Sequence, residues 1–337
     1  MAENQKIMTA KHLILPALVV AMALVCSAAQ DVGSVLAGDK AKVAVPETVL
    51  VGDRQPALSG DAMIRGKVGA SEIVVTTTTR LAGAIHSLTW NSKEFIDSAD
   101  HGRQLQSASS FQLGSGKFNA ETYNPTEAGS RKDGAGPKST SKLLEFHAKG
   151  NQLRTKSQMA FWLAPGEKSA GDLARNDRVL SDHLLAKRVI IGVKDLPNVL
   201  DYQGTFTVPK GEKANLGQFE VLTGYMPEEF RSFWRLDPAT GKLLPLDDGP
   251  GEQPMPVVLA TADGKYAMGI VSVTPPGFGP PGYGRWRFVR ERVVKWNTVF
   301  RTRNASAIAT GDYTFQNYVA IGTLEDVRTS LMAVMPR

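Results

Sequence analysis

Cysteine is almost absent from this chain of 337 residues, which has a single thiol at Cys26. One thiol can form neither an intramolecular disulfide nor a thiolate metal cluster. The fold must therefore be stabilised by its hydrophobic core. With 42% hydrophobic and 21% charged residues, the chain has enough apolar material for one large β domain or two ordinary domains.

Specific catalytic and metal-binding motifs are absent as well. The Gly-Ser-Gly at residues 114–116 lacks the strand-to-helix context of a serine-hydrolase nucleophile elbow. The histidines do not show the close spacing that is typical of metal-binding motifs. The sequence therefore predicts no metal and no cofactor, and it indicates a functional class and a candidate site rather than a named reaction.

Blocks of basic charge are also missing, although the formal net charge is +6. The exception is residues 285–303, where RWRFVRERVVKWNTVFRTR interleaves arginine with aromatic residues. Such a stretch could bind nucleic acid. The alternation favours a simpler interpretation, a pair of strands with solvated arginines on one face. We therefore expect no nucleic-acid partner.

The N-terminus has the features of an export signal. Two lysines precede an apolar run over residues 13–25, and Ser-Ala-Ala at 27–29 supplies the small residues of a cleavage site. The run is shorter than the roughly 20 residues that a membrane-spanning helix needs, which favours cleavage before Gln30 over a retained anchor. We predict a signal peptide over residues 1–29, no membrane attachment after its removal, and a periplasmic or extracellular location.

The remainder of the chain is typical of an all-β protein. Residues 30–65 show little periodicity and are predicted to be a linker or a loosely docked arm. Over residues 66–337, short alternating apolar and polar runs are separated by turns rich in glycine and proline, and no long amphipathic helix interrupts them. This pattern predicts a single, large, mostly antiparallel β-sandwich with few short helices.

One alternating run, GAIHSLTWNSKEFID at residues 83–97, resembles the early strand pair of the galactose-mutarotase-like β-supersandwich superfamily. In that superfamily a glycine-led strand runs through a short turn into a strand that carries Lys and Glu. Ser92 stands where those proteins usually have glycine. The superfamily includes aldose epimerases, domains of glycosidases and polysaccharide lyases. The resemblance implies a concave sheet that faces a sugar, but no catalytic residue is carried over, because the epimerase His/Glu pair has no match in this chain.

Polar residues gather directly after that run. In a strand, His101 and Arg103 would share one face, where His101 could transfer a proton and Arg103 could bind a carboxylate or a pair of hydroxyls. A loop stiffened by Pro125 presents Glu127 as a further acid or base. A polar surface turn with Arg103 in a salt bridge is the structural alternative. We predict His101, Arg103 and Glu127 as catalytic residues, and the predicted substrate-binding residues are Asp100, Gln106, Asn124, Tyr225 and Trp234.

The predicted function is that of an exported carbohydrate-active protein acting on a polysaccharide or oligosaccharide in a concave cleft. Acid–base chemistry in such a cleft would suit a glycosidase, a lyase or an epimerase, of which a glycoside hydrolase or a polysaccharide lyase is favoured. The alternative, from another class, is a non-catalytic carbohydrate-binding or cell-envelope structural protein on the same fold.

Overall fold

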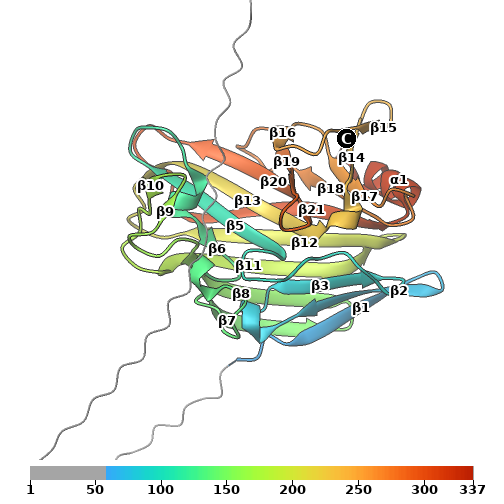
Figure 1. Ribbon diagram of the computed structural model, residues 1–337, viewed down its shortest axis with the longest axis horizontal. Helices are drawn as coiled ribbons and strands as arrows, with labels where there is room; N and C mark the ends of the chain where they lie inside the picture. Colours follow the sequence, from blue (N-terminus) through green and yellow to red (C-terminus); the bar gives the residue numbers. More distant parts are fainter. Residues whose placement is uncertain (1–57, 337) are drawn as a thin grey trace, which may run out of the picture. The chain divides into compact units, whose positions relative to one another are not determined.

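The computed structural model describes residues 58–336, which form a β domain of antiparallel strands with one α-helix (Figure 1). The all-β prediction is therefore confirmed. The predicted signal peptide lies outside the described residues, as does most of the predicted linker. Within the described part of that linker, the first strand already begins at Ala62.

Two large layers contain most of the strands. The front layer runs in the order β1 (Ala62–Val68), β2 (Ser71–Thr77), β3 (Ile85–Trp90), β5 (Leu105–Leu113), β13 (Ala214–Pro227), β20 (Val293–Arg303), β19 (Gly282–Phe288) and β16 (Gly251–Gln253). The back layer runs in the order β7 (Lys142–Lys149), β8 (Gln152–Phe161), β11 (Leu180–Val193), β12 (Leu196–Val208), β21 (Gly311–Gly322), β18 (Ala267–Val273), β17 (Val257–Ala260), β14 (Ser232–Leu236) and β15 (Leu243–Pro245).

Short elements connect the layers and decorate their edges. The strand β6 (Pro125–Thr126) pairs with β5 in the front layer and with β8 in the back layer, and so joins the two. The other short strands are β4 (Lys93–Glu94), β9 (Lys168–Ser169) and β10 (Asp172–Leu173). Four 3₁₀ turns are η1 (Thr79–Leu81), η2 (Ala120–Tyr123), η3 (Arg131–Asp133) and η4 (Glu228–Phe230).

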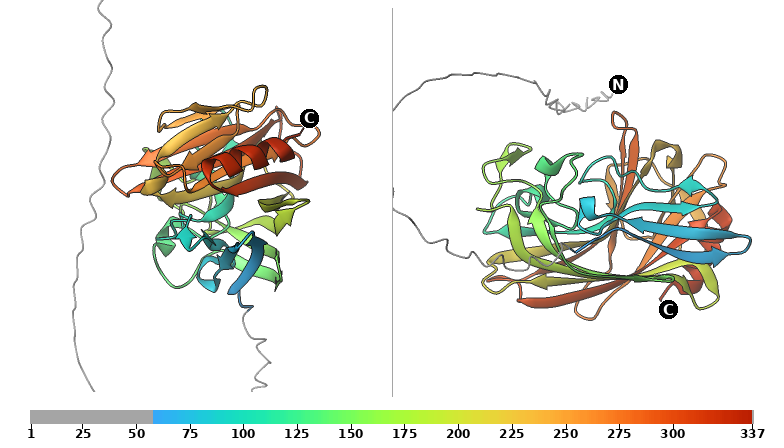
Figure 2. Two further views of the ribbon diagram at one scale, coloured as in Figure 1. Left: turned by 90° about the vertical axis from the view of Figure 1, so that its right-hand side faces the viewer. Right: turned by 90° about the horizontal axis from the view of Figure 1, so that it is seen from below.

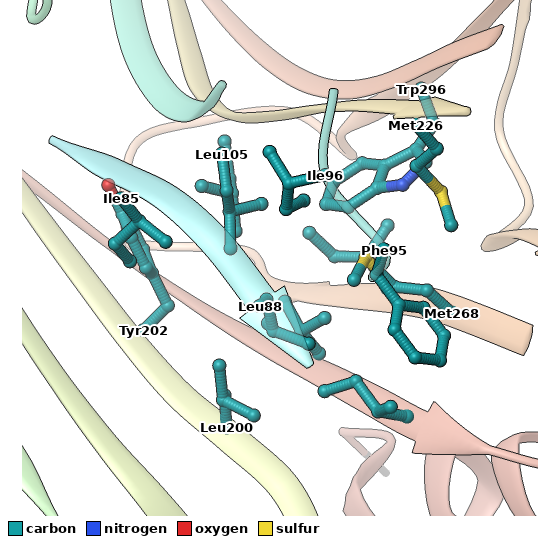
Figure 3. Packing of buried hydrophobic residues seen from close by; sticks show 14 of the residues in the cluster. Ile85, Leu88, Phe95, Ile96, Leu105, Leu200, Tyr202, Met226, Met268 and Trp296 are labelled. Carbon is teal, nitrogen blue, oxygen red and sulfur yellow. The ribbon is translucent and has the colours of Figure 1, made fainter. Parts of the chain in front are cut away.

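The main hydrophobic core lies between the two layers. Both layers send apolar side chains inward. β12 contributes Leu200 and Tyr202 by alternation, while β3 contributes Ile85 and Leu88, whose three-residue spacing goes with a register shift against β2. Figure 3 shows these side chains pointing toward one another. The fully buried Trp296 of β20 joins the same cluster.

The α-helix covers the outer side of the back layer. The helix α1 (Leu324–Val334) begins with a capping box, in which Thr323 and Asp326 exchange side-chain-to-backbone hydrogen bonds. Its apolar residues Val327 and Leu331 belong to the cluster between the helix and the strands β12, β18 and β21. Figure 2 shows the helix lying against the neighbouring strands. The outer face of the front layer is left free of any such helix among the described residues, and it holds the cavity described next.

Candidate functional site

A concave cavity of about 410 Å³ lies on the outer face of the front layer. Neighbouring strands β5, β13, β20, β19 and β16 supply most of its lining, and loop residues close its sides. The lining residues that carry polar groups or aromatic rings are Gln106, Ser110, Glu121, Asn124, Thr126, Trp162, Gln218, Glu220, Thr223, Tyr225, Glu252, Trp286, Phe288, Lys295, Asn297 and Arg301.

A β-bulge in β13 sets the floor of this cavity. The register against β20 shifts between Glu220 and Leu222, and the extra residue changes which side chains face outward. Residues Gln218, Glu220, Thr223 and Tyr225 therefore all line the cavity although their spacing breaks strict alternation. As a result the Thr223 hydroxyl donates a hydrogen bond to the Glu220 carboxylate.

An ion pair between Glu220 and Lys295 lies in the floor, where their side chains are 15% and 14% exposed. The Lys295 Nζ lies 2.9 Å from Glu220 Oε1. Burial raises the pKa of Glu220, but the charge of Lys295 and hydrogen bonds from Thr223 and Asn297 outweigh it, so the pKa falls below its ordinary value. Burial lowers the pKa of Lys295, but the charge of Glu220 outweighs that and raises it above its ordinary value. Both residues are therefore charged at neutral pH.

Aromatic rings surround the ammonium group of Lys295. Its Nζ lies 4.8 Å from the centroid of the Trp286 ring and 5.1 Å from that of Tyr225, within the range of cation–π contacts. Burial raises the pKa of Tyr225, and the neighbouring charge of Lys295 offsets only part of this rise. The Tyr225 hydroxyl therefore stays protonated at neutral pH and remains a hydrogen-bond donor.

Two tryptophans stand at the sides of the cavity, each against a glycine. A Cβ at Gly102 would lie 2.6 Å from the Trp162 ring, and a Cβ at Gly284 would lie 2.3 Å from the Trp286 ring. Only glycine permits approaches this close. Both tryptophans are partly exposed and line the cavity, so each offers part of an aromatic face to its interior.

The remaining charged groups lie toward the rim. The guanidinium of Arg301 donates two hydrogen bonds of 2.7 Å to the Glu252 carboxylate, and its Nε donates one of 2.8 Å to Gln218. The pKa of Arg301 is raised, mainly by its hydrogen bonds to Glu252. The exposed Glu121 accepts a hydrogen bond from the Ser169 hydroxyl.

One buried polar atom beside the cavity lacks a partner among the described residues. Gln106 is 6% exposed; its side-chain nitrogen donates to the carbonyl of Gly102, while its Oε1 accepts no hydrogen bond. Buried acceptors without a partner are costly.

The predicted catalytic residue His101 lies in a turn rather than in a strand, so the predicted shared face with Arg103 does not form. His101 is 1% exposed. Its Nδ1 and Nε2 lie 2.7 and 2.9 Å from the backbone carbonyl oxygens of Gly134 and Arg80. Both ring nitrogens thus hold backbone segments together and face no cavity. A catalytic role for His101 stays a prediction that this geometry does not favour.

The other two predicted catalytic residues also have structural contacts. The guanidinium of Arg103 pairs with Asp100 at 2.9 Å and with Asp97 at 3.7 Å, as in the salt-bridge alternative. Glu127 is fully buried, where it pairs with Lys187 and accepts a hydrogen bond of 3.0 Å from the backbone of Ser107. The structure does not bring His101, Arg103 and Glu127 into one open cleft. The catalytic assignment of these residues stays a prediction.

Three of the five predicted substrate-binding residues line the concave cavity, namely Gln106, Asn124 and Tyr225. Asp100 does not line it and binds Arg103 instead. Trp234 lies on β14 and packs on the cluster beneath α1.

Sequence reasoning missed Glu220, Lys295 and most other lining residues. The region 285–303 does form the predicted pair of strands, β19 and β20. A signal was present there, because Lys295, Asn297 and Arg301 alternate with residues that belong to the core. The bulge in β13 interrupts the alternation of inward and outward side chains around Glu220, and no residue pattern in the sequence predicts that bulge.

A larger hollow of about 900 Å³ lies between the turn that joins β1 to β2 and the one that joins β3 to β4. Its lining consists of the ends of β1, β2 and β3 together with the four turn residues Gly69, Ala70, Asn91 and Ser92. Within residues 58–336, no group of histidine, cysteine and acidic side chains could hold a metal ion, and no helix is long and apolar enough to cross a membrane.

Comparison with known proteins gives only distant structural neighbours. No family model and no curated protein sequence matches the chain. The solved structures that are similar include the Slr1438 protein of Synechocystis, with 10% identity, a TM-score of 0.41, and coverage of 78% of this chain and 96% of that one. The heparan sulfate lyase HepC of Pedobacter heparinus has 10% identity, a TM-score of 0.39, and coverage of 81% and 37%.

An α-galactosidase of Lactobacillus brevis is similar at 8% identity and a TM-score of 0.41, with coverage of 78% of this chain and 40% of that one. The chain therefore spans well under half the length of the lyase and of the galactosidase. Carbohydrate-active enzymes are among the structural neighbours, but identities and TM-scores at this level assign no function. Membership of the galactose-mutarotase-like superfamily stays a prediction.

Proposed function

We propose that the concave cavity on the front layer binds a carbohydrate. The observation that carries this proposal is the combination of two tryptophan faces, from Trp162 and Trp286, with a floor of amide, hydroxyl and charged groups. The apolar C–H face of a sugar ring packs well on an indole, whereas its hydroxyls need paired donors and acceptors. A cavity of about 410 Å³ has room for one or two sugar rings.

Three side chains are well placed to bind sugar hydroxyls. Asn124 donates to the Ser109 carbonyl and to the Ser110 hydroxyl, which holds its amide in a fixed orientation at the side of the cavity. Asn297 accepts from the backbone of Gly284 at 3.2 Å. The Glu220 carboxylate is held by neighbours on several sides. Groups fixed in this way lose little conformational entropy when a ligand binds.

A catalytic role for the same cavity is the second candidate. It is favoured by two carboxylates, Glu220 and Glu252, which line one cavity together with the protonated Tyr225. A glycosidase needs two carboxyl groups about 5–10 Å apart. Under this candidate Glu220, which is ionised at neutral pH, is the base or nucleophile.

The experiment is a binding and turnover screen of the purified protein on a panel of polysaccharides and oligosaccharides. Binding is measured by calorimetry, and products are detected as new reducing ends or as unsaturated sugars. We expect Trp286→Ala to weaken binding at least tenfold, because it removes the stacking face. Trp90→Ala is the matched control, since Trp90 is also partly exposed but lies outside the cavity.

If no carbohydrate binds, or if Trp90→Ala weakens binding as much as Trp286→Ala does, the proposal is wrong. Products that disappear in Glu220→Gln would establish the catalytic candidate. Binding without any product would support a carbohydrate-binding protein that is not catalytic.

Export of the protein remains part of the proposal. It is supported by the two lysines, the apolar run over residues 13–25 and the small residues at 27–29. Mass spectrometry of the protein recovered from a secreting host should find an N-terminus at Gln30. An intact N-terminus in the exported protein would contradict this cleavage site.

A further inference from the structure

We propose that the concave cavity selects uncharged, hydroxyl-rich oligosaccharides and discriminates against glycans that carry uronate carboxylates or sulfates. This inference rests on the carbohydrate-binding function proposed above and deepens it. It follows from the way in which every cationic side chain of the cavity is already neutralised by a carboxylate of the same cavity.

Among residues 58–336, the lining contains two cationic side chains, and each is paired. Lys295 binds Glu220 at 2.9 Å, and Arg301 binds Glu252 through two hydrogen bonds of 2.7 Å. An Arg–carboxylate pair with two parallel hydrogen bonds uses the same fork that would bind a uronate or a sulfate. An anionic ligand would therefore have to displace Glu252 from Arg301 before it could use that guanidinium.

A third carboxylate makes the cavity acidic overall. Glu121 lines the same cavity and has no cationic partner among the described residues. Arg103, in the turn before β5, does not line the cavity and is already bound to Asp100 and Asp97. The charged lining therefore consists of three carboxylates and two paired cations. A negative ligand meets repulsion there without a free cation to offset it.

The uncharged part of the lining suits hydroxyl groups. Amides from Gln106, Asn124 and Asn297 and the hydroxyl of Tyr225 offer both donors and acceptors. The unpartnered Oε1 of Gln106 is an acceptor, and a sugar hydroxyl would satisfy it by donating, which a carboxylate or sulfate cannot do.

The test uses matched pairs of ligands. Each uronate oligosaccharide of the binding panel is compared with its carboxyl-reduced counterpart, which has the same backbone and a hydroxymethyl group in place of the carboxylate. We expect the neutral member to bind at least about tenfold more tightly to the full-length protein. The preference should grow when the ionic strength is lowered, because repulsion is then screened less.

Uronate oligosaccharides that bind as tightly as their reduced counterparts, or more tightly, would overturn the inference while the carbohydrate-binding function stands. A protein that binds no carbohydrate of the panel, whether paired or not, would instead refute the proposed function itself. The two failures are therefore distinguishable within one experiment.

A variant tests the cause of the selectivity. Glu252→Gln removes the charge that occupies Arg301, and we expect the preference for the neutral ligand to fall about tenfold. Glu72→Gln is the matched control, because Glu72 pairs with Arg65 in an exposed ion pair outside the cavity. An unchanged preference in Glu252→Gln, or an equal change in Glu72→Gln, would overturn the assignment of selectivity to the paired cations.

Discussion

The pairs Glu127–Lys187 and Glu220–Lys295 join the same two residue types, yet they occupy opposite surroundings. Both side chains of the first pair are fully buried inside the sandwich. Those of the second are about one-seventh exposed, and they face a cavity on the outside of the front layer. The first pair is closed off from solvent, whereas the second faces a cavity that a ligand could enter. The chemistry of a residue type does not by itself locate a site.

The contrast extends to the neighbours of each pair. Around the first pair the further partners are backbone groups, because the Ser107 N–H donates to Glu127 and the Lys187 ammonium donates to the Gly83 carbonyl. Around Lys295 the partners are the rings of Tyr225 and Trp286, which form a wall and still leave room beside them. Four predictions test this division between structural and ligand-facing polar groups, and they run from the largest expected effect to the smallest.

Loss of the buried pair should have the largest effect. We expect Glu127→Gln to lower the free energy of unfolding by about 3–5 kcal/mol, because it leaves the charge of Lys187 buried without a counter-charge. Urea unfolding followed by circular dichroism measures this. The control is the double variant Glu127→Leu with Lys187→Met, which should recover much of the loss since no buried charge remains. A loss below about 1 kcal/mol in Glu127→Gln would show that water reaches this pair.

His101 should behave as a structural residue of the same kind. His101→Ala leaves the carbonyls of Gly134 and Arg80 without their ring partners and opens a cavity, so we expect a loss of about 2–3 kcal/mol in the free energy of unfolding. Carbohydrate affinity at a temperature where the variant is folded should be unchanged. Weaker binding by a fully folded variant would return His101 to the ligand site.

Much of the fold, but little of the site, could be predicted from the sequence. Side chains alternate between the two faces of a strand, so the face of β20 on which each side chain lies could be recognised. The fold divides the polar stretch from Asp100 to Glu127. Gln106 and Asn124 line the concave cavity, whereas His101 and Glu127 are buried where the short β6 joins the two layers.

The residues that line the concave cavity could not be found from alternation alone, because they come from strands that are distant in sequence. Glu220 and Lys295 become neighbours only through the pairing of β13 with β20. The close approach of Trp162 to Gly102 likewise depends on how a loop after β8 returns to the turn before β5. Neither contact has a local pattern, so neither could be predicted without the topology.

The Glu220–Lys295 pair should govern how binding depends on pH. The pKa of Glu220 lies below its ordinary value of 4.5, and the pKa of Lys295 lies above its ordinary value of 10.5. The pair and its stabilising effect are therefore fully present between these values. They are lost as pH falls through the lowered pKa of Glu220, or rises through the raised pKa of Lys295.

Calorimetric affinity for a neutral oligosaccharide should accordingly be constant between about pH 5 and pH 9. We expect Glu220→Gln to weaken binding about tenfold at neutral pH, because a charged acceptor is replaced by a neutral one. Circular dichroism at each pH serves as the check on folding. A marked change in affinity near pH 6–7 would indicate that a histidine, and not this pair, controls the site.

The smallest effect is expected at Trp234, which the sequence analysis predicted as a substrate-binding residue. Its ring packs on the cluster between the back layer and α1, on the side of the sandwich opposite to the concave cavity. Trp234→Phe keeps an aromatic ring there, and the indole nitrogen that it removes has no hydrogen-bond partner among the described residues. The free energy of unfolding should therefore change by less than about 1.5 kcal/mol, and carbohydrate affinity should not change at all. Any loss of affinity in this variant would place a second sugar contact on the back layer, and the division between the two faces would no longer hold.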